Sequence, residues 1–464
     1  MSTRTERDTM GEMQVPADAL YGASTARAVE NFPIARRPLP AAMIHAFGHL
    51  KAACAIANRD LGKLEADITS AIVAAADEVA TGQHDAHFPV DVYQTGSGTS
   101  TNMNANEVIA TLATRSLGRK VHPNDHVNMG QSSNDTFPTA MNLAAVLQLR
   151  VLLDDALPRL ERALERLSNQ WDTIIKVGRT HLMDATPIRM GQVFGGYRAQ
   201  IHDATRDLRD AMSQLSHNLA IGGTAVGTRI NTDRAFGQTV AEQLTRRLSP
   251  DRMIEFKEAG NHPAAQASRD DIVGAHGSLK RLAVSLSRIA SDIRLLASGP
   301  RCGIGELILP AVQPGSSIMP GKVNPVLCES MMQVACRVIG NDATITTAGL
   351  GGVGSIFELN VAMPVIADAF LESVSLLTNV SSLFVGKVLD GLQVDERRCR
   401  ELLERSVMTI TALVPALGYD RCADLAKRAM KEDRTIRELV LEAGLLPPEE
   451  LDKLLDPDAM IRPG

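Results

Sequence analysis

Two long seams of apolar residues, repeated three and four positions apart, constrain the fold of this 464-residue chain more than any other feature. Such spacing places every member of a seam on one face of an α-helix. Pro158 is expected to kink the first helix, and a third apolar stretch, 364–392, also reads as helix. The seams consist of Leu153, Leu157, Leu160, Leu164, Leu167 and Trp171, and of Leu279, Leu282, Leu286, Ile289, Ile293 and Leu296.

These helices are expected to reach about 30 residues, or about 45 Å at a rise of ~1.5 Å per residue. The mean helix of a globular protein has only about 11 residues. Helices of this length favour a long-helix bundle, and one that is shared between subunits. A coiled-coil fibre is the alternative, and the Gly- and Pro-rich loops that repeatedly interrupt the pattern count against it.

Composition agrees with an all-α fold. Hydrophobic residues make up 44% of the chain but aromatic residues only 3%, so the core must consist mainly of aliphatic side chains, which suit packed helices. The length exceeds what one core supports. We expect three domains: an N-terminal helical domain at 1–131, a central long-helix domain at 132–391 and a small C-terminal helical domain at 392–464. Gly444 is expected to end one helix of this last domain, and Pro447 and Pro448 to open the next.

The charge balance argues against several classes of partner. The net charge is −6 with no basic domain, which disfavours nucleic acid. The chain starts without an apolar signal segment, and no stretch reads as long and apolar enough to cross a membrane. The six scattered cysteines include no CxxC motif, and we interpret them as thiols in a reducing cytoplasm.

Five polar loops stand out between the apolar helices. Each is rich in hydroxyls, amides and glycine, and most have few carboxylates. Hydroxyls, amides and backbone N–H groups exposed by glycine are what a bound carboxylate or phosphate needs. The loops are TGSGTSTNMNANE (95–107), HPNDHVNMGQSSND (122–135), GRTHLMDATP (178–187), GGTAVGT (222–228) and GSSIMPGKVNP (315–325).

The fifth loop is the most informative. Lys322 and Asn324 are two residues apart, so in an extended segment they face the same side and can hold a carboxylate together. Ser316 or Ser317 can serve as a nucleophile or base where positive charge lowers its pKa. A plain turn with a solvated lysine is the alternative, and the four similar loops favour function.

Other motifs are weaker. His181 is either a ligand-facing group or a structural histidine, and Glu329 could orient a histidine. The GxGxxG run at 349–354 lacks a preceding buried strand, so dinucleotide binding is disfavoured. His84 and His87 have no further ligands for a metal site. The absence of a GxSxG motif disfavours a hydrolase triad.

Taken together, the five loops resemble those of the fumarase/aspartase superfamily, and most closely those of class II fumarases. GSSIMPGKVNP matches the superfamily signature, and the resemblance extends from residue 8 to the C-terminal helices. TGSGTST, QSSNDTFPTAM and GGTAVGT look like fumarase. Aspartases tend to carry Ala at the position of Thr99, Thr at that of Ser133, and GATA in place of GGTA.

The resemblance implies an all-α homotetramer around a twenty-helix core, with each active site drawn from three subunits. It implies reversible anti addition of water to fumarate, giving L-malate in the tricarboxylic acid cycle, without metal or organic cofactor. The substrate is thus a small dicarboxylate, and no nucleic acid or membrane partner is expected.

Residue roles carry over by position. Ser316 matches the base, His181 with Glu329 the group that works on the C2 hydroxyl, and Lys322 with Asn324 the carboxylate binders. The remaining matches are substrate contacts, namely Ser97, Thr99, Ser132, Ser133, Asn134 and Thr180, and a secondary anion site, namely Arg119, His122, Asn124 and Asp125.

Four stretches depart from the family pattern. Val193 replaces a Glu, Arg229 with Ile230 replaces Gly-Leu, 261–264 replaces a stretch close to Asn-Lys/Ser-Phe-Glu, and the glycine run at 349–354 is unusual. None removes a matched catalytic residue. The alternatives to fumarate hydratase are therefore a related lyase that releases ammonia or an amine, and a non-catalytic protein on the same scaffold.

Overall fold

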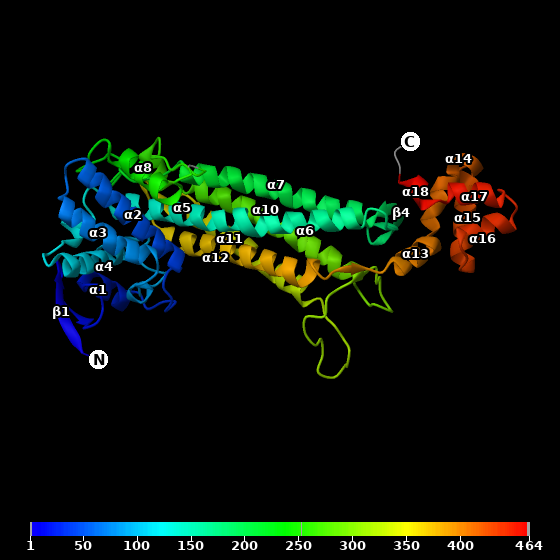
Figure 1. Ribbon diagram of the computed structural model, residues 1–464, viewed down its shortest axis with the longest axis horizontal. Helices are drawn as coiled ribbons and strands as arrows, with labels where there is room; N and C mark the ends of the chain where they lie inside the picture. The colour runs from blue at the N-terminus through cyan, green and yellow to red at the C-terminus, as the bar shows by residue number, and fades with distance from the viewer. Residues whose placement is uncertain (1, 252, 462–464) are drawn as a thin grey trace. The chain divides into compact units, whose positions relative to one another are not determined.

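The computed structural model describes residues 2–251 and 253–461, and it confirms the all-α expectation (Figure 1). The chain forms two compact units. Unit 1 comprises residues 1–155, 204–283 and 334–378, and unit 2 comprises 156–203, 284–333 and 379–464. Each unit is assembled from segments far apart in the sequence, whereas the expected domains were continuous. The boundaries near 131 and 391 stay predictions.

Unit 1 is built on mainly helical N-terminal segments. The α2 helix packs against α3, α5 and α8, and α4 packs against α1 and α3. Gly48 lets α2 and α3 approach closely, since a Cβ there would lie 2.5 Å from the backbone nitrogen of Ala80. The helices are α1 (Ala23–Asn31), α2 (Ala41–Asp60), α3 (Ala66–Ala80), α4 (Thr99–Leu117), α5 (Ser133–Val151), α8 (Phe236–Leu248) and α9 (His262–Ala267).

Unit 2 contains a C-terminal cluster of short helices with its own apolar core (Figure 1, red end of the chain). Gly444 has a φ of +60° just beyond α16, and Pro448 opens α17, as the sequence predicted. The cluster comprises α13 (Glu396–Arg405), α14 (Val414–Leu417), α15 (Tyr419–Glu432), α16 (Ile436–Glu442), α17 (Pro448–Leu454) and α18 (Pro457–Met460).

The expected long helices are present. The second seam lies on α10 (Asp270–Leu296), a helix of 27 residues, and its leucines and isoleucines are buried. Three other long helices contribute to the bundle: α7 (Met190–Ser216), α11 (Val326–Gly349) and α12 (Met363–Phe384). By their residue ranges, α7, α10, α11 and α12 each supply residues to both units.

The first seam is interrupted as Pro158 predicted. A five-residue π-helical turn, Leu152–Ala156, separates α5 from α6 (Leu157–Gln170), and Pro158 lies in the first turn of α6. Proline has no N–H to donate and its ring crowds the preceding turn, so the backbone there cannot keep the regular α-helical ladder. The helical path nevertheless continues, and every leucine of the seam is buried.

One exclusion made from the sequence was too strong. The helical stretches Ser133–Gln170 and Met363–Leu389 are long and apolar enough to cross a membrane by length and composition. In their most apolar windows, however, 78% and 56% of the residues are buried inside the protein, which is the arrangement of core helices.

The part of the chain that the structure describes contains four small antiparallel strand pairs that were not expected from the sequence. They are β1 (Thr3–Asp8) with β2 (Gly11–Pro16), β3 (Ile175–Thr180) with β4 (Met183–Arg189), β5 (Leu307–Ile308) with β8 (Gln393–Val394), and β6 (Ser355–Ile356) with β7 (Leu359–Asn360). The third pair, β5 with β8, joins segments that are far apart in the chain, so no local sequence pattern predicts it.

The glycine run at 349–354 ends α11 and leads into the β6–β7 hairpin. A Cβ at Gly354 would lie 1.8 Å from the Ala348 carbonyl oxygen. The run therefore allows close backbone packing at this hairpin.

This packing predicts a stability loss for Gly354→Ala, because the added methyl overlaps backbone that cannot move aside cheaply. We expect a cost of about 1–3 kcal/mol, read as a lower thermal unfolding midpoint. Gly260→Ala is the control, since nothing lies within 4 Å of its added Cβ. An unchanged midpoint for Gly354→Ala would contradict the packing described.

Candidate active site

Hydroxyl groups in unit 1 gather where α4 and α5 begin. Thr99 is the first residue of α4 and Ser133 the first of α5. The Oγ1 atom of Thr99 lies 2.8 Å from Ser97 Oγ and 2.7 Å from Ser133 Oγ, so three hydroxyls form one chain. Two helix N-termini thus lie side by side. The positive dipole ends of the two helices make this position suitable for an anion.

Asp135 anchors the start of α5. Its Oδ1 accepts from the Ser132 N–H at 2.9 Å, within a capping box in which the Ser132 hydroxyl accepts from Asn134 N–H. Its Oδ2 accepts from the N–H groups of Gly222 (3.1 Å) and Thr224 (2.8 Å). Burial raises the pKa of Asp135 to about 7, and the three N–H donors oppose that rise. This carboxylate therefore fixes the 222–228 loop against the helix.

Asn134 is held by the same loop. Its Nδ2 donates to the Ala225 carbonyl oxygen at 2.8 Å. Thr224 has a φ of +57°, a left-handed conformation that is uncommon for a β-branched residue and that costs about 1–3 kcal/mol. The structure thus brings together five of the predicted substrate contacts in unit 1: Ser97, Thr99, Ser132, Ser133 and Asn134.

Lys51 lies fully buried beneath this cluster, on α2. Its Nζ donates to Asn128 Oδ1 at 3.0 Å and to Gln131 Oε1 at 2.8 Å. Asn128 Oδ1 also accepts from Asn102 Nδ2 of α4. Burial lowers the pKa of Lys51 to about 8, with a smaller opposing effect of Asp135. A buried cation therefore supports the segment that leads into α5.

The predicted secondary anion site is only partly assembled. The Nδ1 atom of His122 accepts from the N–H groups of Asn124 (3.2 Å) and Asp125 (3.1 Å), so these three residues share one turn. Nδ1 also lies 3.2 Å from Asp125 Oδ2. The Arg119 guanidinium donates to Glu65 and Asp67 instead. Its anion-binding role stays a prediction.

In unit 2, Thr180 and His181 lie at the tip of the β3–β4 hairpin. His181 and Leu182 form its two-residue turn with φ values of +57° and +63°. Such turns favour Asn-Gly, so this is an unusual place for a histidine and a leucine. His181 is exposed. Buried Glu306 anchors the hairpin. Its Oε1 lies 2.8 Å from Arg179 Nη2, and its Oε2 lies 3.1 Å from Lys176 Nζ.

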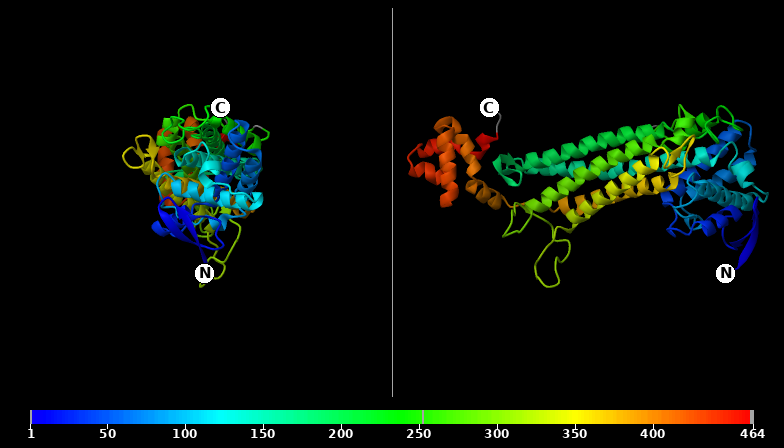
Figure 2. Two further views of the ribbon diagram at one scale, coloured as in Figure 1. Left: turned by 90° about the vertical axis from the view of Figure 1, so that its left-hand side faces the viewer. Right: turned by 180° about the vertical axis from the view of Figure 1, so that it is seen from behind.

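The 315–325 loop, also in unit 2, extends away from the helices (Figure 2, yellow-green). Its base is closed by two hydrogen bonds of 2.8 Å each, from Gly315 N–H to Lys322 O and from Asn324 Nδ2 to Gly315 O. Ser316 Oγ accepts from the N–H groups of Ile318 and Met319, both at 3.2 Å. Two N–H donors favour the ionised form of the hydroxyl they contact.

Lys322 is exposed at the rim of an open hollow of about 480 Å³ that Ser316 also lines. Glu329 is exposed in the first turn of α11. Unit 2 thus carries the six remaining predicted site residues: Thr180, His181, Ser316, Lys322, Asn324 and Glu329. The Asn324 side chain closes the loop here, so one of its amide hydrogens is already used.

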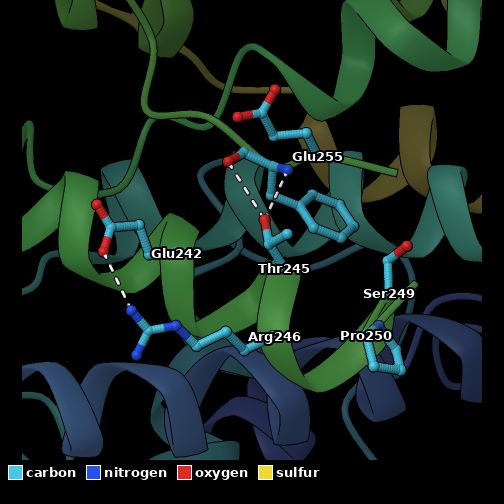
Figure 3. A pocket seen from close by; sticks show the side chains of 7 residues that line it. Glu242, Thr245, Arg246, Ser249, Pro250 and Glu255 are labelled. Carbon is cyan, nitrogen blue, oxygen red and sulfur yellow. Dashed lines mark hydrogen bonds and ion pairs between the residues drawn. The ribbon is translucent and has the colours of Figure 1, made fainter. Parts of the chain in front are cut away.

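A hollow of about 640 Å³ lies at the end of α8 (Figure 3). Its polar groups are engaged with one another or with neighbouring residues. Thr245 Oγ1 accepts from Phe256 N–H at 2.9 Å, and Arg246 lies 3.7 Å from Glu242. The hollow carries no arrangement that suggests chemistry.

Within residues 2–251 and 253–461, no group of three or more His, Cys, Asp or Glu side chains could hold a metal ion. His84 pairs with Glu78 at 2.7 Å. All six cysteines are free thiols, as expected, and four of them are buried.

The sequence reasoning missed Lys51, Asp135 and Glu306. Asp135 had a local signal, because Ser132 followed three residues later by an acidic residue is typical of a capping box. Lys51 is the only charged residue in the apolar stretch 41–58, which favours a buried, partnered lysine. Glu306 had no local signal, since its partners lie more than 120 residues away.

The depressed pKa of Lys51 predicts how stability changes with pH. Between about pH 8 and about pH 10.5 the unfolded chain binds more protons at this lysine than the folded chain does, so folding is favoured as pH rises through that window. The full effect is about 3 kcal/mol. Urea unfolding should show that the free energy of unfolding of the wild type rises relative to that of Lys51→Met between about pH 7 and about pH 10. A constant difference would contradict the lowered pKa of this lysine.

Comparison with known proteins identifies the family of this chain. Residues 11–340 match the model of a lyase family, and residues 410–462 match the fumarase C C-terminus. Fumarate hydratase class II of Corynebacterium glutamicum is 52% identical over 98% of this chain and 96% of its own length. The Mycobacterium tuberculosis enzyme of the same name is 51% identical over 99% of this chain and 96% of its own.

Solved structures give the same result. A class II fumarase from Schistosoma mansoni has a TM-score of 0.94 and 38% identity, over 99% of each chain. A fumarate lyase:delta crystallin from Brucella melitensis bound to cobalt has a TM-score of 0.93 and 43% identity, over the full length of both chains. With a family match over most of its length and relatives near 50% identity, this chain belongs to the class II fumarases of the fumarase/aspartase superfamily.

Proposed function

We propose that this chain is a fumarate hydratase that catalyses the reversible anti addition of water to fumarate, giving L-malate in the tricarboxylic acid cycle. The hydroxyl chain across the N-termini of α4 and α5 carries this proposal, because it offers a dicarboxylate donors without a competing carboxylate. Its relatives named fumarate hydratase class II support it.

In this proposal Ser316 acts as the base. As malate is dehydrated, the C3 proton passes to Ser316 Oγ, and its electron pair moves into the adjacent carboxylate to give an aci-carboxylate. The C2–O bond then breaks, the double bond forms, and the hydroxyl leaves as water with a proton from His181, which Glu329 orients. The N–H groups of Ile318 and Met319 favour the Ser316 alkoxide, and Lys322 with Asn324 stabilises the aci-carboxylate charge.

The positions that separate fumarases from aspartases support hydration over ammonia release. Thr99, where aspartases tend to carry Ala, bridges Ser97 and Ser133, so Ala would break the hydroxyl chain. At Gly223, where the GATA pattern places Ala, a Cβ would lie 2.4 Å from Gln266 Oε1. This loop therefore accommodates the fumarase sequence and excludes the aspartase one.

The assembled form belongs to the same proposal. The enzyme is a homotetramer in which each active site combines unit 1 groups with the unit 2 loop from three subunits. Exposed Ser316-loop residues such as Ile318, at 83% exposure, are consistent with a loop completed by other chains. We place the enzyme in the cytoplasm, since six free thiols suit a reducing compartment.

A substrate panel tests the function. Purified protein is mixed with L-malate or L-aspartate, and fumarate is followed by its ultraviolet absorbance. We expect fumarate from malate only, and Ser316→Ala should lower kcat by about 10²–10⁴-fold because the base is lost.

Ser317→Ala is the matched control, since it removes a neighbouring hydroxyl from the same loop and should keep most of the activity. Fumarate from aspartate but not from malate would establish the related lyase instead. Activity on neither substrate would favour the non-catalytic alternative, and full turnover by Ser316→Ala would refute the assigned base.

A further inference from the structure

Two of the stretches that depart from the family pattern meet at one side chain. Arg229 Nη2 lies 2.9 Å from Glu258 Oε1, and His262 Nε2 lies 3.1 Å from the same oxygen. Arg229 stands where the pattern has Gly, and His262 where it has Lys or Ser. The three residues surround the 222–228 loop, and all belong to unit 1.

Arg229 adopts a backbone conformation that suits the glycine it replaces. Its φ is +62°, and Thr224 and Asn231 on the same segment have φ values of +57° and +60°. A side chain with a Cβ is disfavoured there. The guanidinium is held on both sides, by Glu258 and by the Arg234 carbonyl oxygen, to which Nη1 donates at 2.6 Å. These contacts offset the strain.

Glu258 is inserted tightly behind the loop. Cβ atoms built at Gly222 and Gly237 would lie 3.0 and 2.2 Å from its Oε1. That oxygen has no aligned hydrogen bond, so the Arg229 guanidinium balances its charge by proximity, and His262 Nε2 lies beside it. Nε2 of buried His262 also lies 3.2 Å from the Ile221 carbonyl oxygen. With two acceptors beside it, Nε2 must carry its proton.

The loop connects this cluster to the proposed active site. Gly222 and Thr224 donate to Asp135, and Ala225 accepts from Asn134. Gln266, four residues after His262, donates to the Thr224 carbonyl oxygen at 2.7 Å. A change at Glu258 therefore reaches Asn134 through the 222–228 loop, which packs against Glu258 at Gly222 and binds Asn134 at Ala225.

We propose that Arg229, Glu258 and His262 form an electrostatic clamp that holds the strained 222–228 loop in place, and that this clamp positions Asn134 for substrate binding. The substrate part of this inference rests on the proposed function. The three are positioning residues: they act on the substrate only through the loop.

Kinetics test the positioning role. Glu258→Gln keeps the shape and removes the charge, and we expect the KM for malate to rise roughly tenfold with kcat changed less than about twofold, because Asn134 contributes to ground-state and transition-state binding alike. Arg229→Gly should raise KM similarly, yet keep or raise the thermal midpoint, because it relieves the left-handed strain. A purely structural role would lower the midpoint and leave KM unchanged.

Glu78→Gln is the control, since it removes a comparable carboxylate–histidine pair, with His84, away from the loop. Hydrogen exchange gives a readout that needs no activity: the amides of Gly222 and Thr224 should exchange faster in Glu258→Gln and Arg229→Gly, but not in Glu78→Gln. Unchanged exchange, or a wild-type KM in both clamp variants, would overturn the proposal. Wild-type protein that makes no fumarate would refute the proposed function instead, and the exchange result would still decide whether the clamp exists.

Discussion

One buried carboxylate, Asp135, holds the unit 1 part of the candidate site together. It accepts hydrogen bonds from the start of its own helix and from two amides of a loop almost 90 residues further along the chain. Without that acceptor, three backbone N–H groups would lie unpaired in the interior, which is costly. The position of Asn134 follows from this anchor, and the contact between the Thr99 and Ser133 hydroxyls sets the α5 N-terminus beside that of α4.

The buried charges around the site serve as supports, whereas the groups proposed to meet substrate are neutral or exposed. Lys51 and Glu306 each sit behind a loop or hairpin and satisfy several partners. The hydroxyls of Ser97, Thr99 and Ser133 carry no formal charge. The side chain of His181 is exposed to solvent. This division explains how an acidic chain can offer an anion a favourable place: the local donors decide, and the net charge of −6 does not.

Much of the fold could be predicted from the sequence, because helical periodicity is local. The seam from Leu279 to Leu296 lies on α10, and the interruption at Pro158 falls where a residue without an N–H requires it. The candidate site residues could be grouped by their loops and by resemblance. The β5–β8 pairing and the Glu306 contacts could not be predicted, since they join residues about 90 to 130 positions apart. The clamp could not be predicted either. In the sequence, Arg229 and His262 are two unrelated departures from the family pattern, and only the fold brings both of them to Glu258.

We propose that the unit 1 hydroxyls of one chain and the Ser316 loop of another chain complete one active site. Complementation tests it most directly: Asn134→Ala and Ser316→Ala, each nearly inactive alone, are unfolded together, refolded and assayed for fumarate formation from malate. The mixture should regain activity well above the sum of the two variants, because some sites then combine intact halves from different chains. Native mass spectrometry verifies that mixed oligomers have formed. If these oligomers remain as inactive as the separate variants, the shared active site is contradicted.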